Sequence, residues 1–408
     1  MKLLIITHVS HKFKDESYWA YAPYVREMNL WFNYADEVHV LAPLTKNQPT
    51  KIDASYNHRA LFLEEVPSFN VVNKMQTWNT LKKLPFILKR MFKAMKNADH
   101  IHLRCPGNMG LLGAFVQVFF PKKPKTAKYA GNWDSKSKQP WSYRLQKWIL
   151  SNTFLTKNMQ VLVYGDWPNQ SKNIKPFFTA TYSKQEVVNT TRHEQLRHPD
   201  LVSGSHDLKP DKQMLNQPFD RLRVTKQDEC PSQTLKFLYV GTLTKNKRPQ
   251  LCLEVIHQLT QQGYQVQLDF YGEGPERHVI ENYILDYNLQ KEVILKGNVS
   301  KEELKRAYQN NHFLLFFSQS EGWPKAVAES MFWGCVPITT AVSCVPYMLG
   351  YGTRGTLVKV ENTEIVLAIE SYLINPEKYK EHSQQAMDWS RQFTLEKLEE
   401  EIVKLLKS

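Results

Sequence analysis

The stretch SEGWPKAVAESMFWGCVPI, residues 320–338, decides how the second half of this chain folds. The residues just before it, His312–Ser318, are almost all apolar and have the length of a buried strand. A proline in the first turn and a glycine after the last turn predict a helix over Pro324–Trp333. Val336–Thr339 is apolar again, so we expect the next strand there.

The loop and first helical turn of this stretch have the chemistry of an anion site. The backbone N–H groups of Trp323–Val327 lie at the positive end of the helix dipole, which suits a diphosphate. Glu329, one turn into the helix, can accept hydrogen bonds from the paired hydroxyls of a ribose, and Glu321 can bind hydroxyls of a sugar. Two glutamates eight residues apart also occur by chance in charged helices. The strand before them, with Gly322 and Pro324 between them, favours the site interpretation.

Around this stretch the second half alternates short apolar runs with amphipathic ones. We expect strands at Leu235–Val240, Val266–Tyr271 and Val293–Leu295, and helices at Pro249–Gln262, Lys301–Asn310 and Asn375–Leu406. Ser300 with Glu303 three residues later predicts a capping box at the start of one helix. Gly272 and Gly274 are better explained as loop-forming residues than as phosphate ligands.

The first half has the same alternation of strands and helices. We expect strands at Leu3–Thr7, Glu37–Ala42, His100–Arg104, Thr126–Ala130, Gln160–Tyr164 and Phe178–Tyr182, and helices at Tyr21–Tyr34, Leu81–Asn97, Gly110–Phe120 and Trp141–Leu150. The pattern predicts an α/β protein with two doubly wound, Rossmann-like domains that face a central cleft. The predicted parts are an N-terminal domain at 1–190, a polar connecting segment at 191–234, a C-terminal domain at 235–385 and a last helix at 386–408 that packs back on the first domain.

The stretch at 320–338, with E-x7-E at the start of a helix, resembles the donor-site signature of glycosyltransferase family 4, the group 1 glycosyl transferases of the GT-B fold. Three further segments resemble the family in the same order: FLYVGTLTKNKRP at 237–249, DFYGEGPER at 269–277 and LKGNVSKEEL at 295–304. Together they cover about residues 235–345. The N-terminal THVSHKFKDESYWAYAPYVREMNLW, residues 7–31, more loosely resembles bacterial members that build surface polysaccharides.

The resemblance implies a role for each matching residue. Lys247 and Arg248 neutralise the donor diphosphate, the backbone of Val299 meets the base, Glu321 contacts the sugar and Glu329 the ribose. The implied donor-binding set is Gly241, Lys247, Arg248, Val299, Glu321, Gly322, Trp323, Pro324, Lys325, Ala326, Val327 and Glu329, with Glu321 and Lys247 as the catalytic pair.

Two positions depart from the family pattern. Thr242 stands where the family often has an arginine, so Lys245 or Lys247 must supply more of the positive charge. The loop expected at His8–Tyr21 lacks the glycines that let many members approach the phosphates, which leaves its donor contacts open.

The implied chemistry needs neither a metal nor a cofactor. No D-x-D motif is present to hold a metal, so cations and helix N-termini must meet the charge of the leaving group. In a retaining enzyme of this type the leaving phosphate oxygen takes the acceptor proton, and no protein nucleophile is required. The nucleotide sugar is a substrate, and retention itself is implied by the resemblance alone.

The first half carries the basic character of the chain. Residues 1–190 hold 27 Lys+Arg against 12 Asp+Glu, which attracts anionic partners without choosing among them. In Leu81–Asn97 an apolar stripe opposes a row of lysines, typical either of a helix on an anionic membrane or of one that covers the sheet. Candidates for contacts with the acceptor or the cleft are His8, His102, Arg104, Asn132 and Asp134, although each also has a structural interpretation as a core or loop-capping residue.

We therefore expect a glycosyltransferase that moves a sugar from a UDP- or GDP-sugar to a glycan or lipid-linked acceptor in surface-polysaccharide synthesis. The alternatives are an epimerase or phosphorylase on the same fold, or a non-enzymatic protein that binds polyanions. No nucleic-acid-binding motif supports the last one. The short apolar run at Leu3–Ile6 is no signal peptide, there is no long apolar run, and the five cysteines show no pairing pattern. These features predict a cytoplasmic protein, and the basic helix at 81–97 leaves open a peripheral position on the inner face of the membrane.

Overall fold

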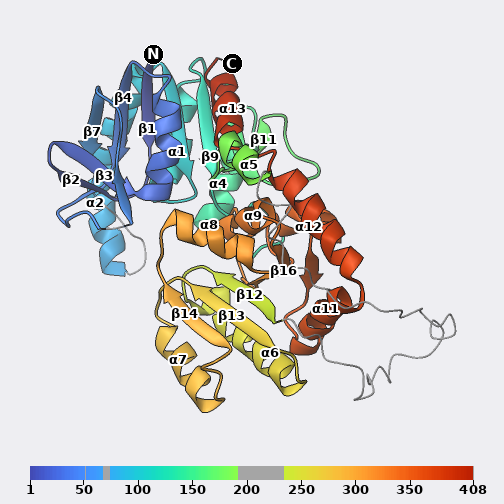
Figure 1. The fold of residues 1–408 in the computed structure, drawn as a ribbon. Helices are drawn as coiled ribbons and strands as arrows, with labels where there is room; N and C mark the ends of the chain where they lie inside the picture. The colour runs from blue at the N-terminus through green and yellow to red at the C-terminus, as the bar shows by residue number, and fades with distance from the viewer. Residues whose placement is uncertain (51, 68–73, 192–233, 408) are drawn as a thin grey trace. The chain divides into compact units, whose positions relative to one another are not determined.

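The computed structural model describes residues 1–50, 52–67, 74–191 and 234–407, which divide into two compact units (Figure 1). Unit 1 comprises Met1–Lys184, Glu321–Trp323 and Phe393–Ser408, and unit 2 comprises Gln185–Ser320 and Pro324–Gln392. The connecting segment predicted at 191–234 lies, apart from its two end residues, outside the described residues. In the described part of the chain no helix is long and apolar enough to cross a bilayer.

Unit 1 contains a seven-stranded sheet in which every neighbouring pair is parallel, in the order β11-β10-β9-β8-β1-β4-β7. The strands are β1 (Lys2–Ile6), β4 (Glu37–Ala42), β7 (Leu61–Glu65), β8 (His100–Cys105), β9 (Lys125–Tyr129), β10 (Met159–Tyr164) and β11 (Ile174–Phe177). The inner strand β1 is buried on both faces, which explains its uninterrupted apolar run.

Helices cover both faces of this sheet. They are α1 (Ala22–Phe32), α2 (Lys74–Asn97), α3 (Asn108–Val116), the 3-10 turn η1 (Gln117–Phe119), α4 (Trp141–Ser151) and α13 (Leu395–Lys407). Leu4 and Ile6 share a core with Ile87 and Met91 of α2, because alternate residues of a strand face the same side. On the other face His102 of β8 packs against α1.

A second, four-stranded sheet in unit 1 replaces the irregular loop predicted at His8–Tyr21, so that prediction is wrong. Its order is β5-β2-β3-β6, with β2 (His11–Lys14), β3 (Ser17–Tyr21), β5 (Leu44–Thr45) and β6 (Asp53–Ser55). Asp15 and Glu16 both have positive φ, as a two-residue hairpin turn of type I′ requires. The usual Asn-Gly or Asp-Gly pair is absent, and the hairpin therefore gave no turn signal.

Unit 2 contains a six-stranded parallel sheet in the order β14-β13-β12-β15-β16-β17. The strands are β12 (Leu235–Val240), β13 (Val266–Tyr271), β14 (Val293–Gly297), β15 (Phe313–Phe316), β16 (Val336–Thr340) and β17 (Thr356–Val358). The helices are α5 (Lys184–Thr191), α6 (Pro249–Gln261), α7 (Arg277–Asp286), α8 (Lys301–Asn310), α9 (Lys325–Phe332), α10 (Val345–Met348), α11 (Asn362–Ile374) and α12 (Pro376–Ser390). This is the strand order of a dinucleotide-binding fold, and it places ligand sites at the carboxyl ends of the strands.

Most predicted elements are confirmed, and two more are wrong. The last strand of unit 1 is Ile174–Phe177 and not Phe178–Tyr182. The helix predicted over Asn375–Leu406 is two helices, α12 and α13, which are separated by a short turn before Leu395. The sequence analysis also predicted none of the strands β5, β6, β7 and β17 and none of the helices α5, α10 and α11.

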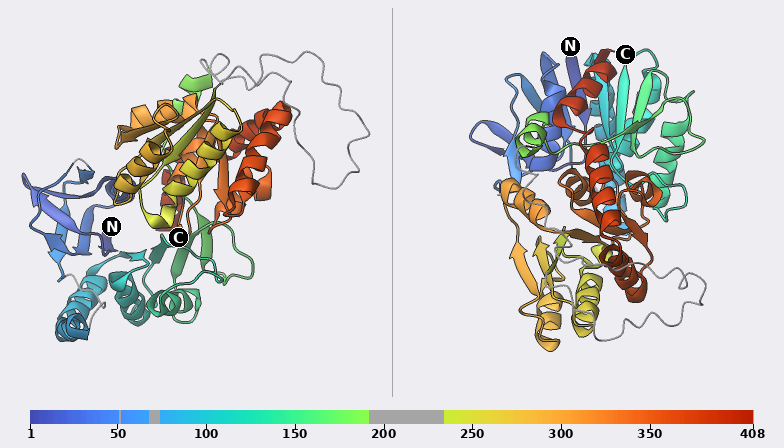
Figure 2. Two further views of the ribbon diagram at one scale, coloured as in Figure 1. Left: turned by 90° about the horizontal axis from the view of Figure 1, so that it is seen from below. Right: turned by 45° about the vertical axis from the view of Figure 1, so that its right-hand side comes forward.

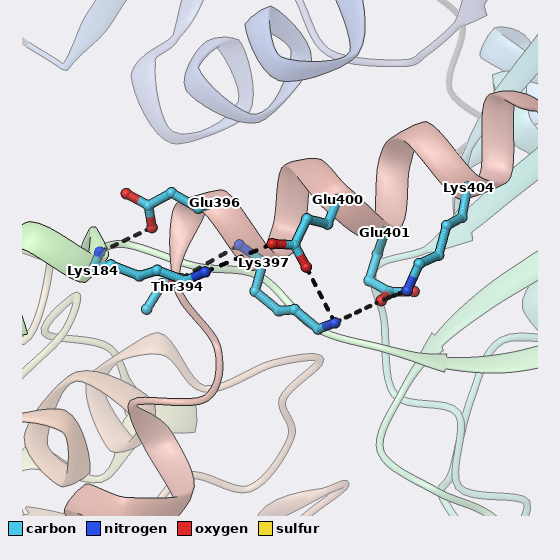
Figure 3. Close-up of polar contacts among 7 residues, drawn as sticks. All are labelled: Lys184, Thr394, Glu396, Lys397, Glu400, Glu401 and Lys404. Carbon is cyan, nitrogen blue, oxygen red and sulfur yellow. Dashed lines mark hydrogen bonds and ion pairs between the residues drawn. The ribbon is translucent and has the colours of Figure 1, made fainter.

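The last helix, α13, packs within unit 1 (Figure 3). The backbone N–H of Leu395 donates to the Tyr182 carbonyl (2.9 Å), and the Lys184 N–H donates to the Glu396 carboxylate (2.9 Å). The side chains of Leu398 and Ile402 are fully buried under the helix. The Lys–Glu pairs that Figure 3 shows along this helix are partly exposed and contribute little by comparison.

Unit 1 buries histidines that are held neutral. The His11 ring nitrogens contact the Val9 carbonyl (2.8 Å) and the Tyr56 hydroxyl (2.7 Å) inside the hairpin region. Burial lowers the pKa of His11 to about 4 and does the same for His100 in β8. In the unfolded chain a histidine binds its proton near pH 6.5.

We predict that acid destabilises unit 1 through these histidines. Between pH 6.5 and about 4 the unfolded state holds a proton at His11 that the folded state lacks, so stability falls as pH falls. The variant His11→Gln removes one such site. Its free energy of unfolding, measured in urea at several pH values, should vary with pH less steeply than the wild type, by up to about 1.4 kcal/mol per pH unit. An unchanged slope would contradict a neutral folded His11.

Candidate functional site

In unit 2 the loops after β12, β13 and β14 lie against one another, backbone on backbone. The Gly241 N–H donates to the Tyr271 carbonyl and the Gly272 N–H to the Gly297 carbonyl, both at 2.9 Å. A Cβ atom on Gly272 would collide with the carbonyl oxygen of Gly241, and one on Gly274 would collide with the backbone of Leu243. Gly272 and Gly274 are thus explained by loop packing.

The basic turn after β12 is clamped to the loop after β15. Residues Lys245–Lys247 form the 3-10 turn η4, and Arg248 follows in the left-handed conformation (φ 51°). The Arg248 guanidinium donates to the Phe317 carbonyl (3.2 Å), and the Gln319 N–H donates to the Asn246 carbonyl (2.9 Å). The Lys247 Nζ lies 5.4 Å from the centre of the Phe316 ring, at the end of β15. The structure therefore brings the predicted Lys247 and Arg248 to the loop that leads into α9.

Helix α9 is confirmed but spans Lys325–Phe332, so it begins one residue later than predicted and Pro324 precedes it. No side chain caps its N-terminus, and Pro324 itself takes an extended conformation. The N–H groups of Val327 and Ala328 donate to the Pro324 carbonyl, which closes the first turn. Lys325, Ala326 and Val327 therefore lie in the first turn, where the helix dipole favours an anion.

The Glu329 carboxylate is oriented from a neighbouring helix. The hydroxyl of Tyr308 in α8 donates to Glu329 Oε2 at 3.2 Å, and the Tyr308 side chain is fully buried. Helix α12 fixes α9 from another side, because the Ser390 hydroxyl donates to the Ala328 carbonyl (2.7 Å). Tyr308 has no counterpart in the sequence prediction, because it lies twenty-one residues before Glu329 and no local pattern links them.

Val299 lies in the short loop between β14 and α8. The N-cap that follows it is as predicted, since the Ser300 hydroxyl accepts from the Glu303 N–H (3.2 Å). The backbone of Val299 is thus held at the same carboxyl edge as the glycine loops.

Residues 321–323 pack within unit 1. The Trp323 ring lies 5.6 Å from the ring of Tyr164, at the end of β10, and 6.1 Å from that of Phe393. A Cβ atom on Gly322 would collide with the carbonyl oxygen of Ala130, just after β9. The two residues that follow Glu321 therefore fix its backbone at the carboxyl edge of the sheet in unit 1.

The candidates His8 and Arg104 lie together at that edge. Burial and the Arg104 charge lower the pKa of His8, and the His8 ring also fills the space beside Gly107. Arg104 donates to the buried Glu27 carboxylate (2.8 Å), which also pairs with Lys128 Nζ (2.9 Å). Glu27 and Lys128 were not among the predicted residues. Lys128 follows Ala127 within a predicted strand, and a lysine in the middle of a strand was a sequence signal that could have marked this cluster.

The other three candidates have structural partners. His102 is fully buried, contacts the Thr126 hydroxyl (2.9 Å) and has no exposed surface. The side-chain amide oxygen Oδ1 of Asn132 accepts from the Asp134 N–H (2.9 Å), and the Asp134 carboxylate accepts from the Lys136 N–H (2.8 Å). Asn132 and Asp134 thus cap their own loop, which is the structural alternative named above, while their ligand contacts stay a prediction.

Among residues 1–50, 52–67, 74–191 and 234–407, no group of three or more His, Cys, Asp or Glu side chains is placed to hold a metal ion. The expectation of a reaction without metal or cofactor stays a prediction.

The comparison with protein families bears on this site directly. Residues 221–389 match the family described as "Glycosyl transferases group 1". The resemblance seen in the sequence is therefore confirmed for the segment that contains the glycine loops, the basic turn and α9.

A curated relative agrees with this match. The chain is 27% identical over 207 residues to the "Putative colanic acid biosynthesis glycosyltransferase WcaL" of Escherichia coli (strain K12). The similar region covers 46% of this chain and 51% of the relative, so the chain spans about half the length of the curated relative it matches.

Two solved structures share the fold over the whole chain. Sucrose-phosphate synthase from Thermosynechococcus elongatus has a TM-score of 0.63 at 16% identity, with 100% of this chain and 98% of that chain covered. Anabaena Alr3699/HepE in complex with UDP and glucose also has a TM-score of 0.63, at 12% identity, with 100% of both chains covered. The predicted GT-B fold is confirmed.

We predict that Gly272 is required sterically as well as for its backbone angle. Gly272 and Gly352 both have φ above +100°, but a Cβ atom meets nothing within 4 Å at Gly352. Gly352→Ala should therefore cost only the left-handed strain, about 1–2 kcal/mol. Gly272→Ala must also displace the Gly241 carbonyl and should lower the urea midpoint of unfolding by clearly more. Equal losses in the two variants would argue against the backbone contact.

Proposed function

We propose that this chain is a glycosyltransferase that moves a sugar from a nucleotide-sugar donor to a glycan or lipid-linked acceptor in surface-polysaccharide synthesis. The family match over 221–389 and the similarity to the WcaL relative support this class of reaction. The observation that carries the proposal is the clamp in unit 2, where Arg248 bonds to the Phe317 carbonyl and holds the basic turn beside the loop into α9. That arrangement meets the needs of a diphosphate leaving group.

The donor is a UDP- or GDP-sugar. Its diphosphate binds Lys247, Arg248 and the first-turn N–H groups of α9, with the loop at Gly241 close by. The ribose hydroxyls bind the Glu329 carboxylate, and the base meets the backbone of Val299. UDP is the first nucleotide to test, because it is the one bound in the HepE structure.

The sugar is held by the segment at 321–323. Glu321 accepts hydrogen bonds from the sugar hydroxyls, and its neighbours Gly322 and Trp323 fix the loop by packing in unit 1. A carboxylate placed in this way orients the anomeric carbon, and such orientation lowers the barrier to reaction.

The reaction needs no protein nucleophile. The bond from the anomeric carbon to the diphosphate oxygen breaks, the acceptor hydroxyl oxygen bonds to that carbon, and its proton passes to the leaving phosphate oxygen. Lys247 stabilises the negative charge that develops on the leaving group, and Glu321 holds the sugar. The configuration is retained, and neither a metal nor a cofactor takes part.

The acceptor binds unit 1, where His8 and Arg104 lie at the carboxyl edge of the sheet. The proposed acceptor is a glycan on a lipid carrier, so the enzyme works in the cytoplasm at the inner face of the membrane. Nucleic acid is not a partner. The basic helix predicted at 81–97 touches the anionic surface of that membrane.

The first experiment is a thermal-shift screen with UDP, GDP, ADP and their sugars. We expect UDP or GDP to raise the melting temperature, since a bound ligand stabilises the fold that holds it. Transfer is then followed by mass spectrometry of a lipid-linked glycan incubated with the matching nucleotide sugar. If no nucleotide stabilised the protein, the donor site would be wrong. Conversion of the free nucleotide sugar without any acceptor would identify an epimerase instead.

The contact between Tyr308 and Glu329 gives a sharper prediction about the ribose. Glu329→Ala should weaken UDP binding about tenfold to a hundredfold, and Tyr308→Phe about threefold to tenfold, because a hydrogen bond to a charged group is lost or misaligned. Neither change should affect 2′,3′-dideoxy-UDP, which lacks the hydroxyls. Isothermal titration calorimetry measures both ligands.

Tyr264→Phe is the matched control, since its hydroxyl also donates to a glutamate at 3.2 Å, but at the amino end of β13. It should leave UDP affinity unchanged. An equal loss for UDP and its dideoxy analogue in Tyr308→Phe would refute the ribose role.

A further inference from the structure

The surplus positive charge of the chain is concentrated in one segment. Residues 74–160 hold 17 Lys+Arg against 2 Asp+Glu, whereas the rest of the chain holds 36 against 38. The segment comprises α2, α3, η1, α4 and the strands β8 and β9. The net positive charge of the chain thus belongs to this segment of unit 1.

The three helices of this segment lie in a row over one face of the sheet, with α3 between α2 and α4 (Figure 2, left). Their inner sides are buried in one core, which includes Met91 and Met95 of α2, Ala114 of α3 and Ile149 of α4. Their outer sides therefore form a single surface, which we call the α2–α3–α4 face.

This face exposes an unusual set of large aromatic side chains. They are Phe86 and Phe92 on α2, Phe115 on α3, Phe119 in η1, Trp141 and Trp148 on α4, and Phe154 just after it. Trp141 and Trp148 are seven residues apart, two helical turns, so they project from the same side of α4. Phe119 is 72% exposed and Phe154 75%, which is costly in water without a partner.

Basic groups lie among these rings. The Arg90 guanidinium lies 4.4 Å from the centre of the Phe86 ring, and Lys157 Nζ lies 5.1 Å from that of Phe154. Lys89 and Lys93, one turn apart on α2, are both exposed. Aromatic rings with lysines and arginines between them are the composition of a protein surface that meets a lipid headgroup layer.

We propose that the α2–α3–α4 face docks on an anionic lipid bilayer. The lysines and arginines are complementary to acidic headgroups, and the exposed Trp and Phe rings enter the interface between headgroups and acyl chains. A nucleic-acid duplex would pair with the same lysines through its phosphates but would leave Phe119 and Phe154 in water. The docking surface is wider than the helix at 81–97, because it includes α4 and the η1 turn, which the sequence did not mark.

The inference deepens the proposed function by placing the acceptor unit on the membrane, but its physical basis is independent of sugar transfer. A bilayer can be bound whether or not a donor binds. Lipid binding measured without nucleotide therefore separates failure of this inference from failure of the proposed function.

The test is sedimentation of the full chain with vesicles of phosphatidylcholine alone or mixed with phosphatidylglycerol. We expect binding to the mixed vesicles and little to the neutral ones. Lys89→Glu with Lys93→Glu should weaken the partition on the order of a hundredfold. Trp141→Ser with Trp148→Ser should weaken it about tenfold or more, and quenching of tryptophan fluorescence by brominated acyl chains should drop.

Matched controls use equally exposed side chains elsewhere. Tyr351→Ser and Phe13→Ser remove rings that are 77% and 53% exposed outside the face, and Lys359→Glu reverses an exposed charge in unit 2. All three should bind vesicles like the wild type, and circular dichroism should show that every variant is folded. Equal binding to neutral and acidic vesicles, or unchanged binding in the tryptophan variant, would overturn the proposal. So would tight binding to single-stranded polyuridylate with none to vesicles.

Discussion

Where the loops after β12 and β13 meet, the carbonyl oxygen of Gly241 fills the space that a Cβ at Gly272 would need. That close approach lets the two loops exchange backbone hydrogen bonds, and it fixes where the chain leaves β12. The basic turn Lys245–Lys247 follows Gly241 by only a few residues, so this contact also fixes where its lysines lie. The same turn is anchored at its other end by Arg248 on the Phe317 carbonyl. One backbone contact and one side-chain contact to a backbone carbonyl thus fix the position of the basic turn.

In unit 1 a buried cluster of charged side chains fixes the position of a basic group. The Glu27 carboxylate holds both Arg104 and Lys128 below the carboxyl edge of the sheet. Desolvating three charged groups is costly, and removing one partner of such a cluster is more costly still. The arrangement therefore fixes the Arg104 guanidinium in one place beside His8, at the edge where a ligand of this fold binds. At this edge ion pairs fix the side chains, whereas in unit 2 close backbone contacts at glycine residues fix the loops.

The features that local patterns determine were the ones that could be predicted. Fully buried parallel strands are apolar runs, and the start of α9 is marked by Pro324, so both were found. The hairpin β2–β3 was missed because its turn is Asp15-Glu16, residues that rarely take positive φ. Tyr308 was missed because its link to Glu329 exists only once α8 and α9 pack. Contacts that tertiary packing creates leave no trace in spacing.

The net charge of a segment can be predicted from the sequence, whereas the exposure of a side chain depends on tertiary packing. The excess of lysine in the first half could be counted from the sequence, but a ring in an amphipathic helix is buried or exposed according to which side the sheet covers. Met91 and Phe92 are neighbours of similar hydrophobicity, yet one is fully buried and the other half exposed. The sequence therefore indicated an anionic partner without choosing one. The exposed rings of α4 and η1 are the observation on which the proposed bilayer partner rests, because an apolar layer beneath a charged surface accommodates both kinds of side chain.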